Sequence, residues 1–206
     1  MMRVIFLIEE PSAEALLKTL LPKLLPAGAD FDLVVFQGKK DLLANLSARL
    51  KAYRKWIPDD WRLVVLLDAD REDCRALKQE LEQIACNAGF ATKTAPDRAG
   101  RFNVLNRIAV EEIEAWFFGD VPALVTAYPG VSPNLGGKAA YRDPDAIRGG
   151  TWEALERVLK RAGHFSAGLS KIQLARTMSS HMDPSRNTSP SFQCFRSGLG
   201  ALSPNP

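Results

Sequence analysis

The stretch that decides the fold is LVVLLDAD, residues 63–70. Its first five residues are aliphatic, and a strand that is buried on both faces of a parallel sheet has this kind of uninterrupted apolar run. The run ends in Asp68 and Asp70, and ligands of open α/β sheets bind at the carboxyl ends of the strands. The two carboxylates therefore mark a candidate site, although they could instead cap the helix that follows.

A second apolar strand is expected at residues 3–8, and it also ends in acid, at Glu9 and Glu10. If the two strands are parallel neighbours, Glu9 lies close to Asp68 and Asp70. Carboxylates gathered in this way repel one another and favour a bound cation. Because Mg²⁺ and Mn²⁺ prefer carboxylate oxygens, the pattern predicts a metal site at Glu9, Asp68 and Asp70.

Strand and helix patterns alternate through the first half of the chain, which indicates an α/β fold with a mostly parallel sheet flanked by helices. The later residues show amphipathic helical patterns and no further strand signal. We therefore expect an α/β domain at residues 1–120 and a helical C-terminal extension, packed on it, at residues 121–206. The expected strands are 3–8, 31–36, 63–70, 90–95 and 103–110, and the expected helices of the α/β domain are 12–25, 39–56 and 72–88.

Composition favours a compact protein of the cytoplasm. The chain has 206 residues, is 46% apolar and carries a net charge of +3, which neither requires nor excludes a polyanionic partner. Its three cysteines are widely spaced and match no zinc-ligand pattern, so we expect free thiols in a reducing compartment. The apolar start is too short for a signal peptide, and no run is long enough to span a bilayer.

A third acidic cluster follows the strand expected at residues 103–110 and includes Glu112 and Glu114. Acidic residues in a first helical turn favour the helix dipole, so Glu112 could simply mark a helix start. Glu114 is harder to explain in that way, because it adjoins the aromatic run at residues 115–118. A charge beside so much apolar surface is unfavourable unless it is paired or bound to a metal.

Basic residues near these acids are candidates for phosphate contacts. Lys138 and Lys171 each follow a short polar segment and could neutralise a phosphate. The helix expected at residues 39–56 also has a basic face that begins at Lys39. Such a face more often faces solvent than nucleic acid, and both interpretations stay open.

Four segments in this order resemble an uncharacterised bacterial family of TOPRIM-like proteins, domain of unknown function 4276. Related families include RloB and the overcoming-lysogenization-defect nucleases. The resemblance covers nearly the whole chain, and its segments are Glu9 to Ser12, Asp68 to Asp70, Glu112 to Asp120 and Tyr141 to Asp145, followed by a tail from Met182 to Phe195.

The resemblance implies a TOPRIM-like fold in which Glu9, Asp68 and Asp70 bind Mg²⁺ or Mn²⁺ for phosphodiester chemistry. Glu112 and Glu114 match the family's later Glu-x-Glu and would complete or flank the site. One departure is Glu10, which stands where TOPRIM proteins usually have glycine. No counterpart of the topoisomerase tyrosine is identifiable, so strand passage is not supported.

Two function classes follow. The first is a metal-dependent nuclease or related phosphodiester-hydrolysing enzyme acting on nucleic acid, in which Glu9, Asp68, Asp70, Glu112, Glu114 and Lys171 are the candidate site residues. The family's associations imply a phage-defence or mobile-element setting and an ATPase partner. The second class is a non-catalytic TOPRIM-like subunit of a larger assembly with such an ATPase.

Overall fold

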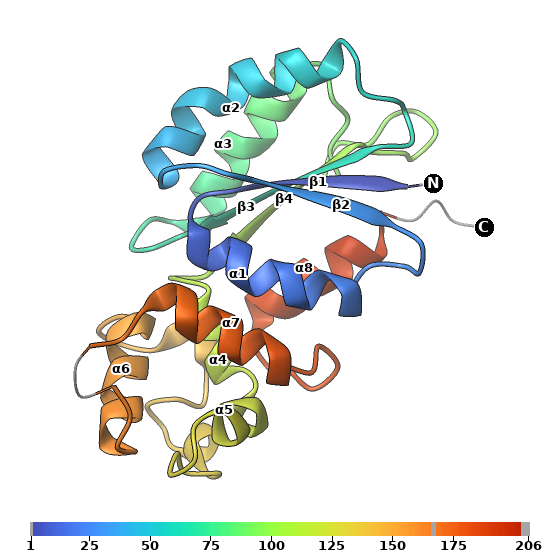
Figure 1. Ribbon diagram of the computed structural model, residues 1–206. Coiled ribbons are helices and arrows are strands. Elements are labelled where there is room, and N and C mark those ends of the chain that lie inside the picture. The colour runs from blue at the N-terminus through green and yellow to red at the C-terminus, as the bar shows by residue number, and fades with distance from the viewer. Residues whose placement is uncertain (1, 166–167, 203–206) are drawn as a thin grey trace. The chain divides into compact units, whose positions relative to one another are not determined.

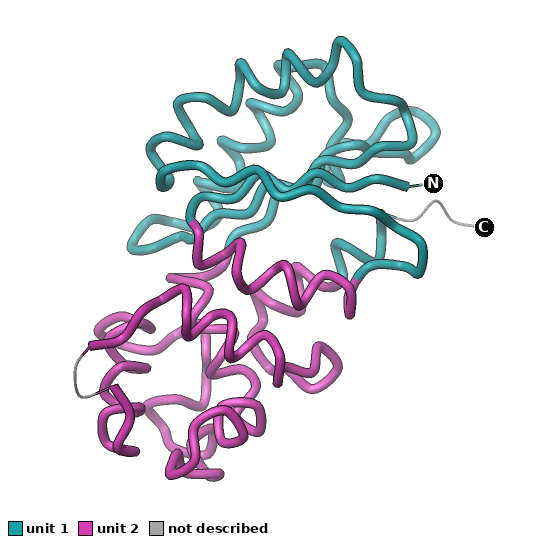
Figure 2. Tube along the Cα trace, in the orientation of Figure 1, with its two compact units in different colours: residues 1–10, 25–108, 197–206 teal, residues 11–24, 109–196 magenta. Residues whose placement is uncertain are grey.

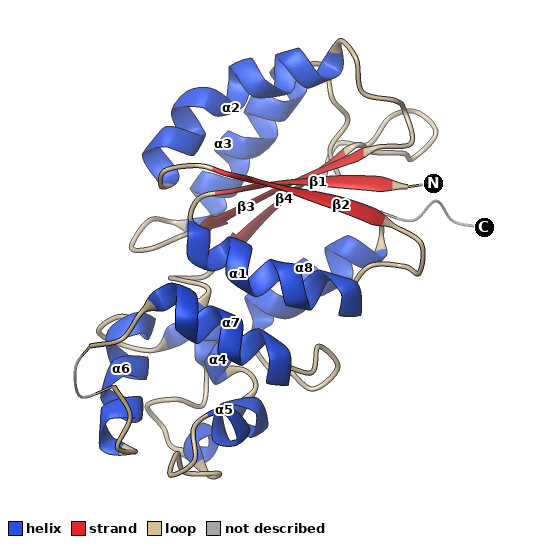
Figure 3. Ribbon diagram, in the orientation of Figure 1, coloured by secondary structure: helices blue, strands red, loops and turns tan. Residues whose placement is uncertain are grey.

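The computed structural model describes residues 2–165 and 168–202 and contains a four-stranded parallel sheet in the order β2-β1-β3-β4. Central β1 pairs with β2 on one side and with β3 on the other, and β4 lies beside β3 (Figure 3). This arrangement confirms the α/β fold expected from the sequence. The strands are β1 (Arg3–Ile8), β2 (Asp30–Val35), β3 (Arg62–Asp68) and β4 (Val104–Ala109).

The apolar strands are buried on both faces, as their composition predicted. Alternate residues of β1 and β3 form one hydrophobic core with α2 (Lys39–Arg54) and α3 (Cys74–Asn87). These two helices lie side by side on the same face of the sheet (Figure 1). On the opposite face Val4, Phe6 and Ile8 are fully buried as well. An uninterrupted aliphatic strand therefore suits this central position.

The strand expected at residues 90–95 is not part of the sheet. Thr92 makes only isolated bridges, to Ala95 and to Val104. The chain turns back on itself here, because the backbone N–H groups of Thr92 and Ala95 each donate to the other residue's carbonyl oxygen. A reversal within four residues leaves too little extended backbone for a strand, so β4 occupies the next sheet position.

The helix expected at residues 12–25 is shorter than predicted. α1 (Pro11–Leu20) begins one residue before Ser12, which is buried in its first turn. A 3₁₀ turn, η1 (Leu21–Lys23), replaces the last expected turns. Pro22 explains this change, because its ring removes a backbone donor and disfavours the preceding helical turn.

The remainder of the chain is helical, and none of the described helices is long and apolar enough to cross a membrane. The three cysteines form no disulfide within the residues described above. The remaining elements are α4 (Glu114–Phe118), α5 (Val121–Ala127), α6 (Thr151–Arg161), α7 (Lys171–His181) and α8 (Pro190–Gly200), with short 3₁₀ turns η2 (Leu135–Gly137) and η3 (Pro144–Ala146).

The chain forms two compact units that are interleaved in sequence (Figure 2). The first unit contains residues 1–10, 25–108 and 197–206 and includes the sheet, and the second contains residues 11–24 and 109–196. This grouping differs from the expected division at residue 120, because α1 and residues 109–120 belong to the helical unit.

The second unit has its own aromatic core around Trp116. The indole ring packs against Phe192 and Phe195 with ring centroids 5.2 and 5.1 Å away, and its N–H donates to the Ser191 hydroxyl at 2.9 Å. The tail segment that starts α8 thus docks onto this core.

Candidate functional site

The carboxyl edge of the sheet brings the ends of β1, β2 and β3 together within the first unit. Ile8, the last residue of β1, pairs with Val35 of β2 and with Leu66 of β3. Glu9 follows directly, and its backbone carbonyl accepts a 2.7 Å hydrogen bond from the N–H of Gly38. Gly38 has a φ of 93°, which favours glycine, and it turns the chain from β2 into α2.

The Glu9 side chain lies against β3, as the parallel pairing predicts. One of its oxygens, Oε2, accepts a hydrogen bond of 3.3 Å from the backbone N–H of Asp68, a buried residue. Burial raises the pKa of the Glu9 carboxyl to about 7, and the charges of Asp70 and Glu10 add to this increase. The bond from Asp68 and the charge of Lys39 oppose it. Glu9 is therefore a carboxylate whose charge is poorly stabilised by the protein alone.

Asp70 is held by Lys39, a lysine for which the sequence predicted no partner. The Lys39 Nζ lies 2.5 Å from Asp70 Oδ2 and 3.0 Å from Glu72 Oε1, and it donates to the Ala69 carbonyl at 3.1 Å. Burial opposes the charge on Lys39, but the bonds to Asp70 and Glu72 prevail and raise its pKa. Asp70 itself has a φ of 50°, a strained backbone conformation of the kind that collects at functional sites.

Lys39 was expected on a basic helix face for which solvent exposure and phosphate contact both stayed open, and for this residue the solvent-exposed interpretation is wrong. Its side chain is only 10% exposed. The signal that could have identified it is positional: Lys39 is the first residue of a helix that starts just after the carboxyl end of a strand.

The alternative role of Asp68 and Asp70 as helix caps does not hold. α3 begins at Cys74, and its N-cap is Asp73, whose side chain accepts hydrogen bonds from the N–H groups of Arg75 and Ala76. Asp68 and Asp70 lie before this cap, so the carboxylates at the sheet edge are not needed to start the helix.

The carboxylates at this edge are of the type that binds a hard divalent cation. They are not grouped as the three-residue metal site that the sequence predicted. Among residues 2–165 and 168–202, no group of three His, Cys, Asp or Glu residues is arranged to hold a metal by itself. Mg²⁺, however, usually takes one or two protein carboxylates and completes its shell with water and phosphate oxygens. Glu9 and Asp68 are adjacent at this edge and suit that mode. Asp70 is paired with Lys39.

The raised pKa of Glu9 predicts a pH-dependent effect of Glu9→Gln on stability. An acid with a higher pKa in the folded state binds more protons there, so its contribution falls as pH rises from about 4.5 to about 7. At pH 8 we expect Glu9→Gln to be more stable than the parent by roughly 2 kcal/mol, a value discounted for partial solvent access. Below pH 4.5 the two proteins are expected to be equally stable.

Urea unfolding at several pH values measures this difference, with exposed Glu80→Gln as the matched control. The prediction would be contradicted if the free energy of unfolding changed with pH in the same way for Glu9→Gln and for the parent.

The second unit contains a separate group formed by Glu112, Glu114 and Lys171. Glu112 Oε1 accepts from Lys171 Nζ at 3.1 Å, while Oε2 accepts from the Thr151 hydroxyl at 3.1 Å and the Trp152 N–H at 3.0 Å. Glu112 thus binds the N-terminus of α6, a stabilising position for a carboxylate. The helix-start interpretation is wrong for the helix that follows in sequence, because α4 begins at Glu114 with Ile113 as its N-cap. Glu112 contacts the start of α6 instead.

Lys171 and Glu114 complete this group. The Lys171 Nζ lies 4.0 Å from Glu114 Oε1 and 5.2 Å from the centre of the Trp152 ring. Glu114 is buried, so a nearby cation supplies the charge compensation that the sequence required. Lys138, the other lysine considered for phosphate contact, is exposed in the same unit.

The fold and its carboxylates define a parallel α/β protein with acidic side chains at the C-terminal ends of its strands. The chain matches the family described as a domain of unknown function, DUF4276, over residues 8–200, and it belongs to that family. No curated protein and no solved structure matches the chain.

Proposed function

We propose that this protein is a TOPRIM-like, Mg²⁺- or Mn²⁺-dependent enzyme that hydrolyses phosphodiester bonds of nucleic acid. The observation that carries the proposal is the position of the Glu9 carboxylate at the carboxyl edge of a parallel sheet, where its Oε2 lies 3.3 Å from the backbone nitrogen of Asp68. Burial there also raises the pKa of Glu9 to about 7. Such an edge is where open α/β sheets bind their ligands. A cation beside Glu9 would restore its ordinary ionisation.

In this proposal Glu9 and Asp68 hold the metal, and Asp70 joins them when Lys39 turns toward a phosphate. The bound ion would activate a water and stabilise the charge that develops on the leaving oxygen. Lys39 is the basic residue best placed in the first unit to neutralise the phosphate, because its ammonium group is already at this edge. That Glu112, Glu114 and Lys171 complete the site stays a prediction.

The resemblance to the defence nucleases also supports a proposal about where the protein acts in the cell and with which partner. It supports a cytoplasmic protein of a phage-defence or mobile-element system that acts together with an ATPase partner. No described helix spans a membrane, which is compatible with that setting.

The test is cleavage of end-labelled single- and double-stranded DNA and RNA with Mg²⁺, with Mn²⁺ and with a chelator. The proposal expects cleavage of at least one substrate that depends on the metal. Cleavage that persists in the chelator would refute metal dependence, and no cleavage of any substrate would refute the enzyme.

A second candidate function is a non-catalytic subunit of an assembly that includes the ATPase. It is favoured by the pairing of Asp70 with Lys39 and by the lack of a three-ligand metal group among the described residues. This candidate expects no turnover with either metal, but a stable complex with an ATPase partner.

Lys39→Gln separates the role of this lysine in holding Asp70 from a role in phosphate binding. We expect the apparent affinity for Mn²⁺ to rise by about tenfold, because the competing cation on Asp70 is removed. Cleavage at saturating Mn²⁺ is expected to fall at the same time, because the phosphate loses its positive partner.

Metal-dependent stabilisation and initial cleavage rates provide the two measurements. The neighbouring and exposed Lys40→Gln is the matched control for the loss of one charge. Unchanged metal affinity and rate in Lys39→Gln would exclude both roles.

A further inference from the structure

A polar pocket of about 280 Å³ lies in the first unit, at the amino-terminal edge of the sheet. Arg62 is the first residue of β3, and Asn103 directly precedes β4, so the pocket is at the strand ends opposite to Glu9 and Asp68. Its size is near the lower limit of small-molecule sites, roughly 300 Å³. The pocket is thus distinct from the carboxylate edge.

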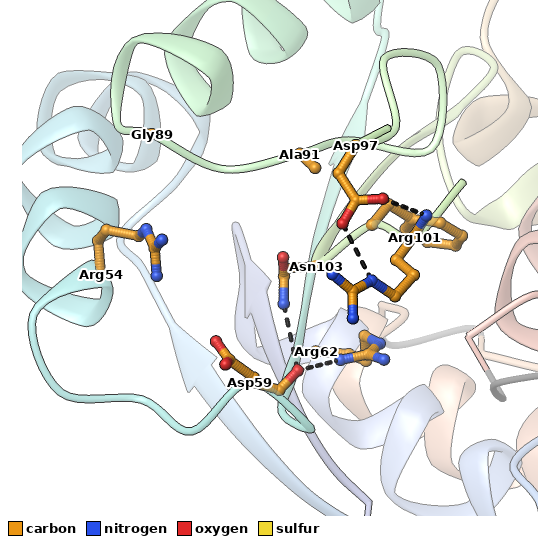
Figure 4. Close-up of a pocket in the computed structure, with 9 residues that line it drawn as sticks. Arg54, Asp59, Arg62, Gly89, Ala91, Asp97, Arg101 and Asn103 are labelled. Carbon is orange, nitrogen blue, oxygen red and sulfur yellow. Dashed lines mark hydrogen bonds and ion pairs between the residues drawn. The ribbon is translucent and has the colours of Figure 1, made fainter. Parts of the chain in front are cut away.

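Arginines approach this pocket from two sides. Figure 4 shows Arg54 on one side of the opening and Arg62 with Arg101 on the other. Three arginines and two aspartates, Asp59 and Asp97, are among its lining residues, which leaves a net positive charge. Guanidinium groups provide several N–H donors in a plane and are well suited to phosphate oxygens.

The carboxylate of Asp97 accepts hydrogen bonds from residues of its own loop. Oδ1 accepts from the backbone N–H groups of Ala99 and Arg101, each at 2.8 Å, and Oδ2 accepts from Arg101 Nε at 3.0 Å. The Arg101 bond uses Nε, so its two terminal nitrogens are left for a ligand. Asp97 therefore positions the arginine and does not simply cancel its charge.

The other two arginines are also held in place. Arg62 Nη1 donates to the carbonyl oxygens of Asp59 at 2.8 Å and Trp61 at 3.0 Å, and the Arg54 guanidinium lies 5.7 Å from the centre of the Phe90 ring. Burial lowers the pKa of Arg62, and the charge of Arg101 contributes to the decrease, whereas Asp60 and Asp59 oppose it. An anion between these arginines would relieve their mutual repulsion.

We propose that the pocket lined by Arg54, Arg62 and Arg101 binds a phosphate group carried by a nucleotide or by the end of a nucleic-acid strand. Both sources present the same phosphate oxygens to the arginines. This site is independent of the proposed metal chemistry, because it shares no residue with the carboxylate edge.

Calorimetric titration of the full chain tests the site, at constant ionic strength and without divalent metal. The probes are pyrophosphate, a mononucleotide 5′-phosphate and a short oligonucleotide with or without a 5′-phosphate. We expect saturable binding of pyrophosphate that weakens by about tenfold in Arg54→Gln and in Arg101→Gln, because each loses a charge-assisted hydrogen bond.

Arg98→Gln is the matched control, since Arg98 is exposed in the same loop as Arg101 but does not line the pocket. It should bind pyrophosphate like the parent. Urea unfolding of each variant verifies that a loss of binding is not a loss of fold.

The oligonucleotide probes distinguish the two sources of the phosphate. Tighter binding of the 5′-phosphorylated strand than of the mononucleotide assigns the pocket to a strand end, and the reverse assigns it to a free nucleotide. The proposal is overturned if no probe binds, or if Arg54→Gln and Arg101→Gln bind pyrophosphate as well as Arg98→Gln does. Asp68→Asn is expected to keep this binding even if no nuclease activity is found.

Discussion

Asp68→Asn is expected to lower metal-dependent cleavage by about a hundredfold to a thousandfold, because it removes one of the charges that hold the proposed ion. Asp68 is buried at the end of β3, next to the Glu9 carboxyl. Asparagine has nearly the same shape, so the packing at this position is conserved while the negative charge is lost. The same variant should lose the rise in unfolding temperature that Mn²⁺ gives the parent.

The experiment compares cleavage rates and thermal unfolding, with and without Mn²⁺, in the parent, Asp68→Asn and Glu80→Gln. Glu80 is an exposed acid on α3, so its loss changes the net charge equally without touching the sheet edge. A variant Asp68→Asn that cleaves and responds to Mn²⁺ like the parent would remove Asp68 from the proposed site. No metal response in any of the three proteins would favour the non-catalytic subunit.

The largest effect on stability is expected for Asp120→Ala in the second unit. Asp120 is fully buried, and one oxygen accepts from Arg186 Nε at 2.7 Å and from the Ala123 N–H at 3.1 Å. The other oxygen accepts from the Asp183 N–H at 2.8 Å. The carboxylate thus caps α5 and joins it to the segment after α7.

Asp120 is buried, but the side chain of its partner Arg186 is 42% exposed and stays solvated when the carboxylate is lost. Loss of the N-cap costs about 1 kcal/mol, and leaving a further buried donor without an acceptor costs about 1–3 kcal/mol, so the total is roughly 2–4 kcal/mol. We expect Asp120→Ala to lower the free energy of unfolding by that amount in urea titrations. Asp183→Ala is the matched control: Asp183 also faces Arg186, at 3.8 Å, but its side chain is 46% exposed. Its loss should cost less than about 1 kcal/mol. Equal effects of the two variants would show that burial does not set the strength of this pair.

Much of the site could be predicted from local sequence. The aliphatic runs of β1 and β3 identify central parallel strands, and the acids that follow mark their carboxyl ends. The contact of Glu9 with the Asp68 backbone then follows from the parallel pairing alone. The missing strand at residues 90–95 shows the limit, because a short apolar segment does not reveal that its backbone reverses at Thr92.

The sequence by itself determined that this is a parallel α/β protein with acidic strand ends, because periodicity and strand termination are properties of neighbouring residues. Only the tertiary structure decided that Lys39 neutralises Asp70, that Glu112 binds the start of α6, and that three arginines meet in one pocket. The partners in these contacts are far apart in sequence: Glu112 and Trp152 are separated by 40 positions. The position of the backbone in the folded chain determines which groups a long charged side chain can reach. A local sequence pattern contains no information about that position.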